Sequence, residues 1–354
     1  MTILISVTRV PECLIETQGY VSNRRQPRRA GFRASLMSLV LFVGTYVGAA
    51  AAEEFRLLAS WSPAYVGHAE IAQRFIGQME RREDVDVAIR IIGPEAIPPF
   101  EQFQPAAAGL VDLLFTHGAY HVGESGIGVA LDAVTADTAS RRSSGLWTMV
   151  DEHYRDYGLK LLALPTSARG YHMLLNDPIT TQCNLGGRKI RGSPVYQGVI
   201  RALAGTLVVL PAGEVYAALE KHVIDGTAWP AAGSLPFRWY EVSKYYLRPT
   251  FGTTTHLMLM NLERFDGLDS TLRHAVLAEG ERLERDVLER FDELVTTESS
   301  EFERHGLIRT ELCGEPLQRL ARSWADGVWD LALYKNRDAA QRLRTLARNA
   351  GLAQ

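Results

Sequence analysis

The sequence predicts an α/β protein of two domains, and three observations lead to this expectation. The chain has 354 residues, 46% of them hydrophobic and 22% charged, which is the composition of a globular protein too long for one ordinary core. Strand-like and helix-like patterns alternate along it, as in proteins built from βαβ units. One helical pattern, residues 270–304, would be on the order of 50 Å long, which is enough to brace both domains.

The strand-like segments are short runs that are either apolar throughout or apolar at every second position. They cover residues 55–61, 85–92, 110–116, 159–166, 171–177, the segment around Ile190, 206–211, 255–261 and 306–312. Gly226 follows Asp225 at a point where we expect a turn. No segment has the composition of a disordered linker, so we expect structured crossings between the domains.

The helix-like segments carry apolar residues three and four positions apart. Ile71, Phe75 and Met79 share one face of the first, and Val215 and Leu219 share one face of a later one. The predicted helices cover residues 65–83, a short turn ending at Ala108, 140–157, 195–203, 212–223, 270–304 and 316–347. Together the two patterns indicate α/β lobes followed by a helical C-terminal part.

The first residues have the order of a secretory signal peptide. Five arginines between residues 23 and 34 precede an apolar run from Leu36 to Val47, and small residues follow. The run is shorter than the roughly 20 residues of a spanning helix. We expect cleavage near Ala52, with residues 1–22 as a possible mis-assigned start; the alternative is an uncleaved anchor.

Charge and cysteine content exclude several functions. Without residues 1–52 the chain keeps 32 basic and 39 acidic side chains, so it should repel a phosphate backbone and nucleic acid is not an expected partner. The three cysteines, Cys13, Cys183 and Cys313, show neither a CxxC pair nor zinc-site spacing. They therefore say little; no cofactor is expected, and whether a metal ion bridges a ligand stays open.

Arg191 raises a chemical question. It lies in the middle of "GGRKIRGSPVYQ", between Ile190 and Gly192, in a short β-branched segment that has the pattern of the start of a buried strand. A guanidinium cannot lose its proton to escape an apolar site, so it needs an anion. Either the protein supplies that anion or a ligand does.

Four motifs give the chain a family resemblance. They are "NDPIT", "GGRKIRG", "GEVYAALEKHVIDGTAWP" and "YEVSKYY", in the order and at close to the intervals typical of one protein family. With them the sequence resembles the extracytoplasmic solute-binding proteins of TRAP transporters over most of residues 54–345. The resemblance implies a periplasmic-binding-protein-like fold of two α/β lobes with a long helix bracing both. It also implies a periplasmic protein that closes over a small organic acid, delivers it to membrane permease subunits and performs no chemistry.

The resemblance also suggests a division of the chain. Lobe I would hold residues 53–166 and about 253–290, and lobe II residues 167–252 and about 291–354. The same fold could serve a ligand sensor. A secreted hydrolase is the alternative from another class, but the sequence has no GxSxG elbow and no HExxH motif.

Two arginines are the candidate anion-binding residues. Arg191 falls on the family's signature arginine, whose fork of N–H donors matches a ligand carboxylate; the alternative is an internal pair with Glu214 or Asp225. Arg169 falls where some members place a second carboxylate-facing arginine, and otherwise it is a solvated hinge residue. The number of ligand carboxylates stays open.

Four further residues are candidates for the cavity wall. His117 ends a strand, where open sheets place ligands; it is a ligand contact, a structural residue, or one half of a metal pair with His121. Trp229 either favours a flat or apolar ligand or packs the hinge. Tyr65 and His68 follow the first strand and face the cleft in such folds.

Overall fold

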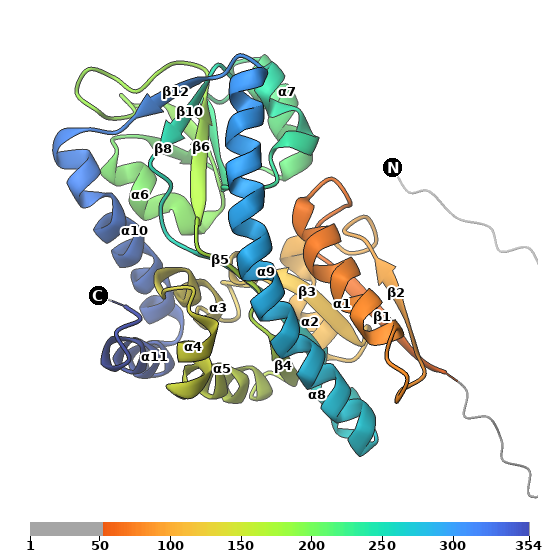
Figure 1. Cartoon of the computed structure of the whole chain (residues 1–354). Coiled ribbons are helices and arrows are strands. Elements are labelled where there is room, and N and C mark those ends of the chain that lie inside the picture. Colours follow the sequence, from red (N-terminus) through yellow and green to blue (C-terminus); the bar gives the residue numbers. More distant parts are fainter. Residues whose placement is uncertain (1–51, 354) are drawn as a thin grey trace, which may run out of the picture. The chain divides into compact units, whose positions relative to one another are not determined.

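The computed structural model describes residues 52–353, which form two mixed β-sheets flanked by helices (Figure 1). The predicted signal segment lies outside the described residues. Within residues 52–353, no helix combines the length and the apolar character that crossing a membrane requires.

The first sheet combines parallel strands from the start of the chain with one long antiparallel strand from its later part. Its order is β2 (Val87–Ile92), β1 (Glu53–Ala59), β3 (Leu113–His117), β11 (Thr254–Asn261) and β4 (Leu159–Ala163), with β5 (Thr166–Ser167) also paired to β11. Because β3 and β11 pair antiparallel with His117 opposite His256, both histidines reach the same edge of the sheet.

The second sheet lies beside the first along the long helix α9 (Figure 1). Its order is β12 (Ile308–Glu311), β10 (Tyr245–Arg248), β6 (Tyr171–Leu175), β9 (Gly226–Pro230), β7 (Lys189–Arg191) and β8 (Thr206–Val208). Strands β9 and β10 were not predicted, and the turn expected at Gly226 was wrong, since this residue begins β9. A five-residue strand ending in proline shows too little periodicity, and pairing with β6 and β7 stabilises it instead.

Helix α9 has the predicted bounds, Ser270–Arg304. The side chain of Asp269 caps it by accepting hydrogen bonds from the N–H groups of Thr271 and Leu272. The helix crosses β4 at Gly280, where a Cβ would lie 2.3 Å from the carbonyl oxygen of Leu162. It packs against elements of both sheets, as a bracing helix should.

Other helices are shorter than their patterns suggested. The predicted helix 140–157 is broken at Gly145, whose φ of 81° is left-handed, and the predicted helix 316–347 is broken at Asn336. Asn336 instead accepts a hydrogen bond from Gly126 N–H at 2.7 Å. The α-helices besides α9 are α1 (Arg74–Glu80), α2 (Phe103–Ala107), α3 (Ile127–Ala130), α4 (Thr138–Ser143), α5 (Leu146–Arg155), α6 (Gln197–Ala202), α7 (Val215–Glu220), α8 (Leu262–Asp266), α10 (Gly314–Lys335) and α11 (Arg337–Asn349).

The lobe boundaries stay a prediction, because the described residues belong to one compact unit. The strands divide between the sheets where the predicted boundaries fall. Helix α11, however, packs against α5 and α3 beside the first sheet, although its sequence lies in the range assigned to lobe II. The C-terminal helices therefore connect the two layers a second time.

A disulfide joins Cys183 to Cys313, with their Cα atoms 5.4 Å apart. It ties the loop after β6 to the residue before α10. No local sequence pattern predicted this pairing, because the two cysteines are 130 residues apart and only the fold brings them together.

Candidate functional site

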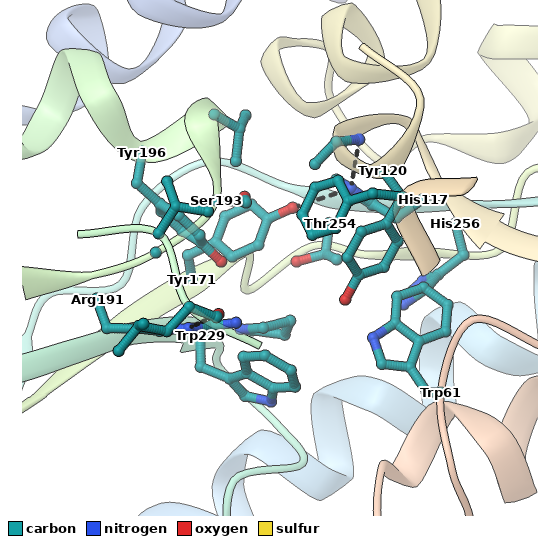
Figure 2. A pocket seen from close by; sticks show the side chains of 17 residues that line it. Trp61, His117, Tyr120, Tyr171, Arg191, Ser193, Tyr196, Trp229, Thr254 and His256 are labelled. Atoms are coloured by element: carbon teal, nitrogen blue, oxygen red, sulfur yellow. Dashed lines mark hydrogen bonds between the residues drawn. The ribbon is translucent and has the colours of Figure 1, made fainter. Parts of the chain in front are cut away.

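A cavity lies between the facing edges of the two sheets, and its wall is largely aromatic (Figure 2). The first sheet contributes His117 at the end of β3 and His256 on β11. The second contributes Tyr171 on β6, Arg191 at the end of β7 and Trp229 on β9. The other lining residues are Trp61, Phe100, Ala119, Tyr120, Gly192, Ser193, Val195, Tyr196, Val209, Leu210, Pro230 and Thr254.

The cavity holds little free space. Its empty space is about 510 Å³ when the part open to solvent is included, and only about 40 Å³ is wide enough for the centre of a water molecule. Two half-exposed apolar side chains, Phe100 and Val209, belong to the wall and mark the side on which it opens.

Arg191 is 5% exposed and lies against this cavity. Its Nε donates to the carbonyl oxygen of Leu210 at 2.9 Å, and its Nη1 has a long contact of 3.5 Å with that of Ala228. The guanidinium carbon lies 5.1 Å from the Trp229 ring centre. Neutral acceptors and a ring face are weak compensation for a buried cation.

Within residues 52–353 no carboxylate forms an ion pair with Arg191. The alternative of an internal pair with Asp225 or Glu214 is therefore not observed, and Asp225 accepts a hydrogen bond from Lys189 N–H at 2.8 Å. Burial lowers the pKa of Arg191, yet an arginine stays charged at neutral pH.

Two tyrosines that the sequence analysis did not single out lie close to this guanidinium. Burial raises the pKa of Tyr196 and of Tyr120, and the charge of Arg191 opposes that rise, so both phenols stay protonated at neutral pH. Tyr196 is buried, and the described residues offer its hydroxyl no hydrogen-bond acceptor. Its place five residues after Arg191, at the carboxyl end of β7, was the available sequence signal.

His117 belongs to a hydrogen-bonded network at the other side of the cavity (Figure 2). Its Nδ1 accepts from Ala119 N–H at 3.1 Å, so the neutral ring carries its proton on Nε2. That Nε2 lies 3.0 Å from Asp132 Oδ2 and 3.0 Å from the Tyr171 hydroxyl oxygen. Protein groups thus occupy both nitrogens, and His117 offers a ligand mainly its ring.

Asp132 supports the network from behind the cavity wall. It is 1% exposed, and its Oδ1 accepts from Thr255 N–H at 2.8 Å. Its Oδ2 accepts from the Tyr171 hydroxyl at 2.6 Å. A buried carboxylate therefore orients both the imidazole and the phenol that face the cavity.

Tyr65 and His68 do not line the cavity. The Tyr65 hydroxyl lies 2.8 Å from Nε2 of His256, and His256 does line the cavity. Tyr65 therefore contacts a lining residue and not the cavity itself. Burial lowers the pKa of His256 to about 3, so this imidazole is neutral. His68 is buried beside the first helix, and burial lowers its pKa as well.

Arg169 also lies away from the cavity. Its side chain is 49% exposed and forms an ion pair with Asp292 of α9, with Nε 2.5 Å from Oδ1. The structure thus brings together Arg191, His117 and Trp229 from the predicted site residues, and separates Arg169, Tyr65 and His68 from them.

The suggested metal pair has other partners. His121 Nε2 lies 2.7 Å from the Tyr154 hydroxyl, and burial lowers the pKa of His121 to about 3. In the described part of the chain, no three histidine, cysteine or carboxylate side chains gather as metal ligands.

Comparison with known proteins places the chain in a family. A model described as bacterial extracellular solute-binding protein, family 7, matches residues 134–326, which is more than half of the chain. The chain therefore belongs to this family of solute-binding proteins. The resemblance found in the sequence motifs is confirmed.

Individual relatives match over shorter stretches. The ectoine-binding periplasmic protein TeaA of Halomonas elongata is 30% identical over 132 residues, which are 36% of this chain and 37% of that protein. The 2,3-diketo-L-gulonate-binding periplasmic protein YiaO of Escherichia coli is 28% identical over 125 residues, 34% and 38% of the two chains. The matched stretch is thus about a third of the length of these curated relatives.

Solved structures share the fold over most of the chain. An extracytoplasmic solute receptor of Bordetella pertussis that binds pyroglutamic acid has a TM-score of 0.73 at 16% identity, covering 84% of this chain and all of its own. A TRAP periplasmic solute-binding protein of Desulfovibrio salexigens with bound orotic acid has a TM-score of 0.72 at 18% identity, covering 84% and 98%. The predicted α/β fold with its long helix is confirmed by these likenesses.

Proposed function

We propose that this protein binds a small organic acid in the cavity between its sheets and delivers it to the permease subunits of a TRAP-type transporter. Arg191 holds the ligand carboxylate through its free N–H donors, and the aromatic wall encloses the rest of the molecule. The protein acts by binding and release, without chemical change to the solute. No nucleic acid and no cofactor takes part.

The observation that carries this proposal is the state of Arg191. It is nearly fully buried, faces the cavity and has no carboxylate partner among the described residues. A charge in this position is costly unless an anion neutralises it. A ligand carboxylate accepts two parallel N–H bonds from the fork and removes that cost.

The known ligands of relatives support the same chemistry. Proteins with this fold are described with bound pyroglutamate, orotate, malonate and β-D-galacturonate, all of them organic acids. A relative in Rhodobacter capsulatus is a C4-dicarboxylate-binding periplasmic protein. The acids differ in size and shape while the carboxyl group is common to them.

Several features support a periplasmic location. The arginine-rich start and apolar run of residues 23–52 have the order of an export signal. The disulfide between Cys183 and Cys313 suits an oxidising compartment outside the cytoplasm. The curated relatives named above are periplasmic proteins.

Closure of two lobes is the proposed way of holding the ligand. The cavity wall comes from both sheets, with Tyr120 and His256 on one side and Arg191 and Trp229 on the other. A ligand that touches both sides only in the closed form has higher affinity for that form and shifts the population toward it. We assign residues 53–166 and about 253–290 to lobe I, and residues 167–252 and about 291–354 to lobe II.

Replacement of Arg191 tests the proposal. Arg191→Ala should weaken binding of organic acids about a hundredfold or more, because two charge-assisted hydrogen bonds of about 1.5 to 3 kcal/mol each are lost. Arg191→Lys should fall between, since it keeps the charge without the fork. Titration calorimetry against a panel of acids, with recovery of unchanged ligand, measures both effects.

Arg169→Ala is the matched control. It removes an arginine of the same charge from an exposed ion pair outside the cavity, so acid affinity should stay within about twofold. Equal losses in the Arg169 and Arg191 variants, or normal acid binding by Arg191→Ala, would contradict the proposed role of Arg191.

A further inference from the structure

We infer that the acid bound here carries a single carboxylate on a flat and otherwise uncharged body. This inference rests on the proposed function and sharpens it to a substrate class. Three features of the cavity carry it: its supply of cations, the buried anion behind its far wall, and its small, largely aromatic space.

The cavity has one cation to offer. Among its lining residues in the described chain, Arg191 is the one side chain with a permanent positive charge. Arg169, which could have served a second carboxylate, is held by Asp292 outside the cavity. His256 is neutral because burial lowers its pKa to about 3. One carboxylate can therefore be neutralised, and a second has no partner of this kind.

The far side of the cavity is unfavourable for an anion. Nδ1 of His117 accepts a hydrogen bond from Ala119 N–H, and its Nε2 lies against Asp132. The Tyr171 hydroxyl donates its hydrogen bond to Asp132. These groups have no further proton to give a second carboxylate. Asp132 itself, buried behind them, would repel that carboxylate at low local dielectric.

The walls favour a flat body. Trp61 and Tyr120 pack together with ring centres 5.4 Å apart, and Tyr171 and Tyr196 meet edge to face at 5.1 Å. Trp229 completes the wall beside Arg191. The space that these rings leave is small. A planar ring can lie against the aromatic side chains, while a puckered ring of equal size is thicker and needs more room.

Three acids of matched shape test the charge requirement: benzoate, 3-carbamoylbenzoate and benzene-1,3-dicarboxylate. The last two have nearly the same size and differ in the charge of one substituent. We expect the full-length mature protein, freed of bound ligand, to bind the dicarboxylate about tenfold or more weakly than the carbamoyl acid. Cyclohexanecarboxylate, which lacks the flat ring, should bind about threefold or more weakly than benzoate.

The variant Asp132→Asn tests the source of the discrimination. It keeps the shape of the side chain and removes its charge, so the gap between dicarboxylate and carbamoyl acid should shrink by about threefold or more. An unchanged gap in a folded variant would remove Asp132 from the explanation. If the variant does not fold, the three-acid series on the unaltered protein still decides the inference.

The outcomes separate this inference from the proposed function. Binding of the dicarboxylate as tightly as the carbamoyl acid, lost in Arg191→Ala, would overturn the inference and leave the proposed function standing. Equal binding of cyclohexanecarboxylate and benzoate would overturn the requirement for a flat body. Failure of every acid to bind, including the malonate and pyroglutamate known from relatives, would overturn both.

Discussion

Two buried arginines of this molecule have very different surroundings. Arg141 of α4 is 1% exposed and Arg191 of β7 is 5% exposed, and neither forms an ion pair with any described residue. Arg141 uses all three of its nitrogens in hydrogen bonds to neutral acceptors. These are the carbonyl oxygens of Thr135, Leu131 and Val134 and the hydroxyls of Thr166 and Thr255. Arg191 has one good hydrogen bond, one long contact and an open cavity beside it.

The two arginines differ in how many of their N–H donors have partners within the protein. The donors of Arg141 are satisfied by the fold, and Asp132 and Glu284 favour its charged state from nearby, although burial still lowers its pKa to about 10. Arg141 therefore holds together the loop after α3, strand β5 and strand β11. Among the described residues, Arg191 makes only one good hydrogen bond and one long contact, so most of its donors have no partner there. Under the proposed function, unused hydrogen-bonding capacity, and not burial alone, distinguishes a ligand-binding arginine from a structural one.

The largest expected effect separates the two arginines by stability. Arg141→Ala should lower the free energy of unfolding by about 3 kcal/mol or more, because it leaves several buried acceptors without donors. Arg191→Ala should change the stability of the ligand-free protein by about 1 kcal/mol or less, since it also removes an unpaired cation. Urea denaturation of both variants without ligand measures the difference. A loss in Arg191→Ala as large as that in Arg141→Ala would show that Arg191 serves the fold.

Of the two arginines, only Arg191 could be singled out from the sequence. Arg191 stood out because charge is unusual at the end of a β-branched strand, and a family motif surrounds it. Arg141 and its neighbour Arg142 are alike in sequence; helix α4 turns Arg141 inward, while Arg142 pairs with Glu284. Such a choice depends on the helix phase and on strands far along the chain. No local pattern contains it.

The same limit explains what else the sequence predicted and missed. Periodicity gave helix α9 with its bounds and most of the strands, because these are properties of neighbouring residues. The pairing of Cys183 with Cys313 and the attachment of Arg169 to Asp292 depend on segments that meet only in the fold. Tyr120 and Tyr196 gained their significance from nearness to Arg191, which requires both sheets in place.

The pH dependence of stability is a second test, with a smaller expected effect, of the difference between the cavity wall and the surroundings of Arg141. His256 in the cavity wall has a pKa of about 3 in the folded protein and about 6.5 when unfolded. The unfolded chain therefore binds more protons between these values, so this stability is complete above pH 6.5 and is lost as pH falls. At pH 5 the loss from His256 should be about 2 kcal/mol. The neutral acceptors around Arg141 do not titrate in this range.

The variant His256→Gln isolates this contribution. It removes the titrating group, so the slope of the unfolding free energy against pH should decrease relative to the unaltered protein. The decrease should correspond to about one bound proton at pH 5 and about half a proton at pH 6.5. His121, His153 and His172, whose pKa values burial also lowers, remain and contribute to the rest of the slope. Urea denaturation at several pH values gives both slopes. Identical slopes would mean that His256 does not stay neutral in the folded protein.

The smallest expected effect concerns the ring behind Arg191. Trp229 presents its face to the guanidinium at 5.1 Å, a contact that Arg141 lacks among the cation–aromatic contacts of the described residues. Trp229→Phe keeps an aromatic wall but weakens this attraction by about 0.5 to 1 kcal/mol and removes part of the flat surface. Affinity for a planar acid such as benzoate should fall about threefold. Acetate, which is too small to cover the ring, should bind with unchanged affinity. Equal losses for both acids would show that Trp229 acts only by positioning Arg191, and unchanged affinity for both would place it in the packing of β9.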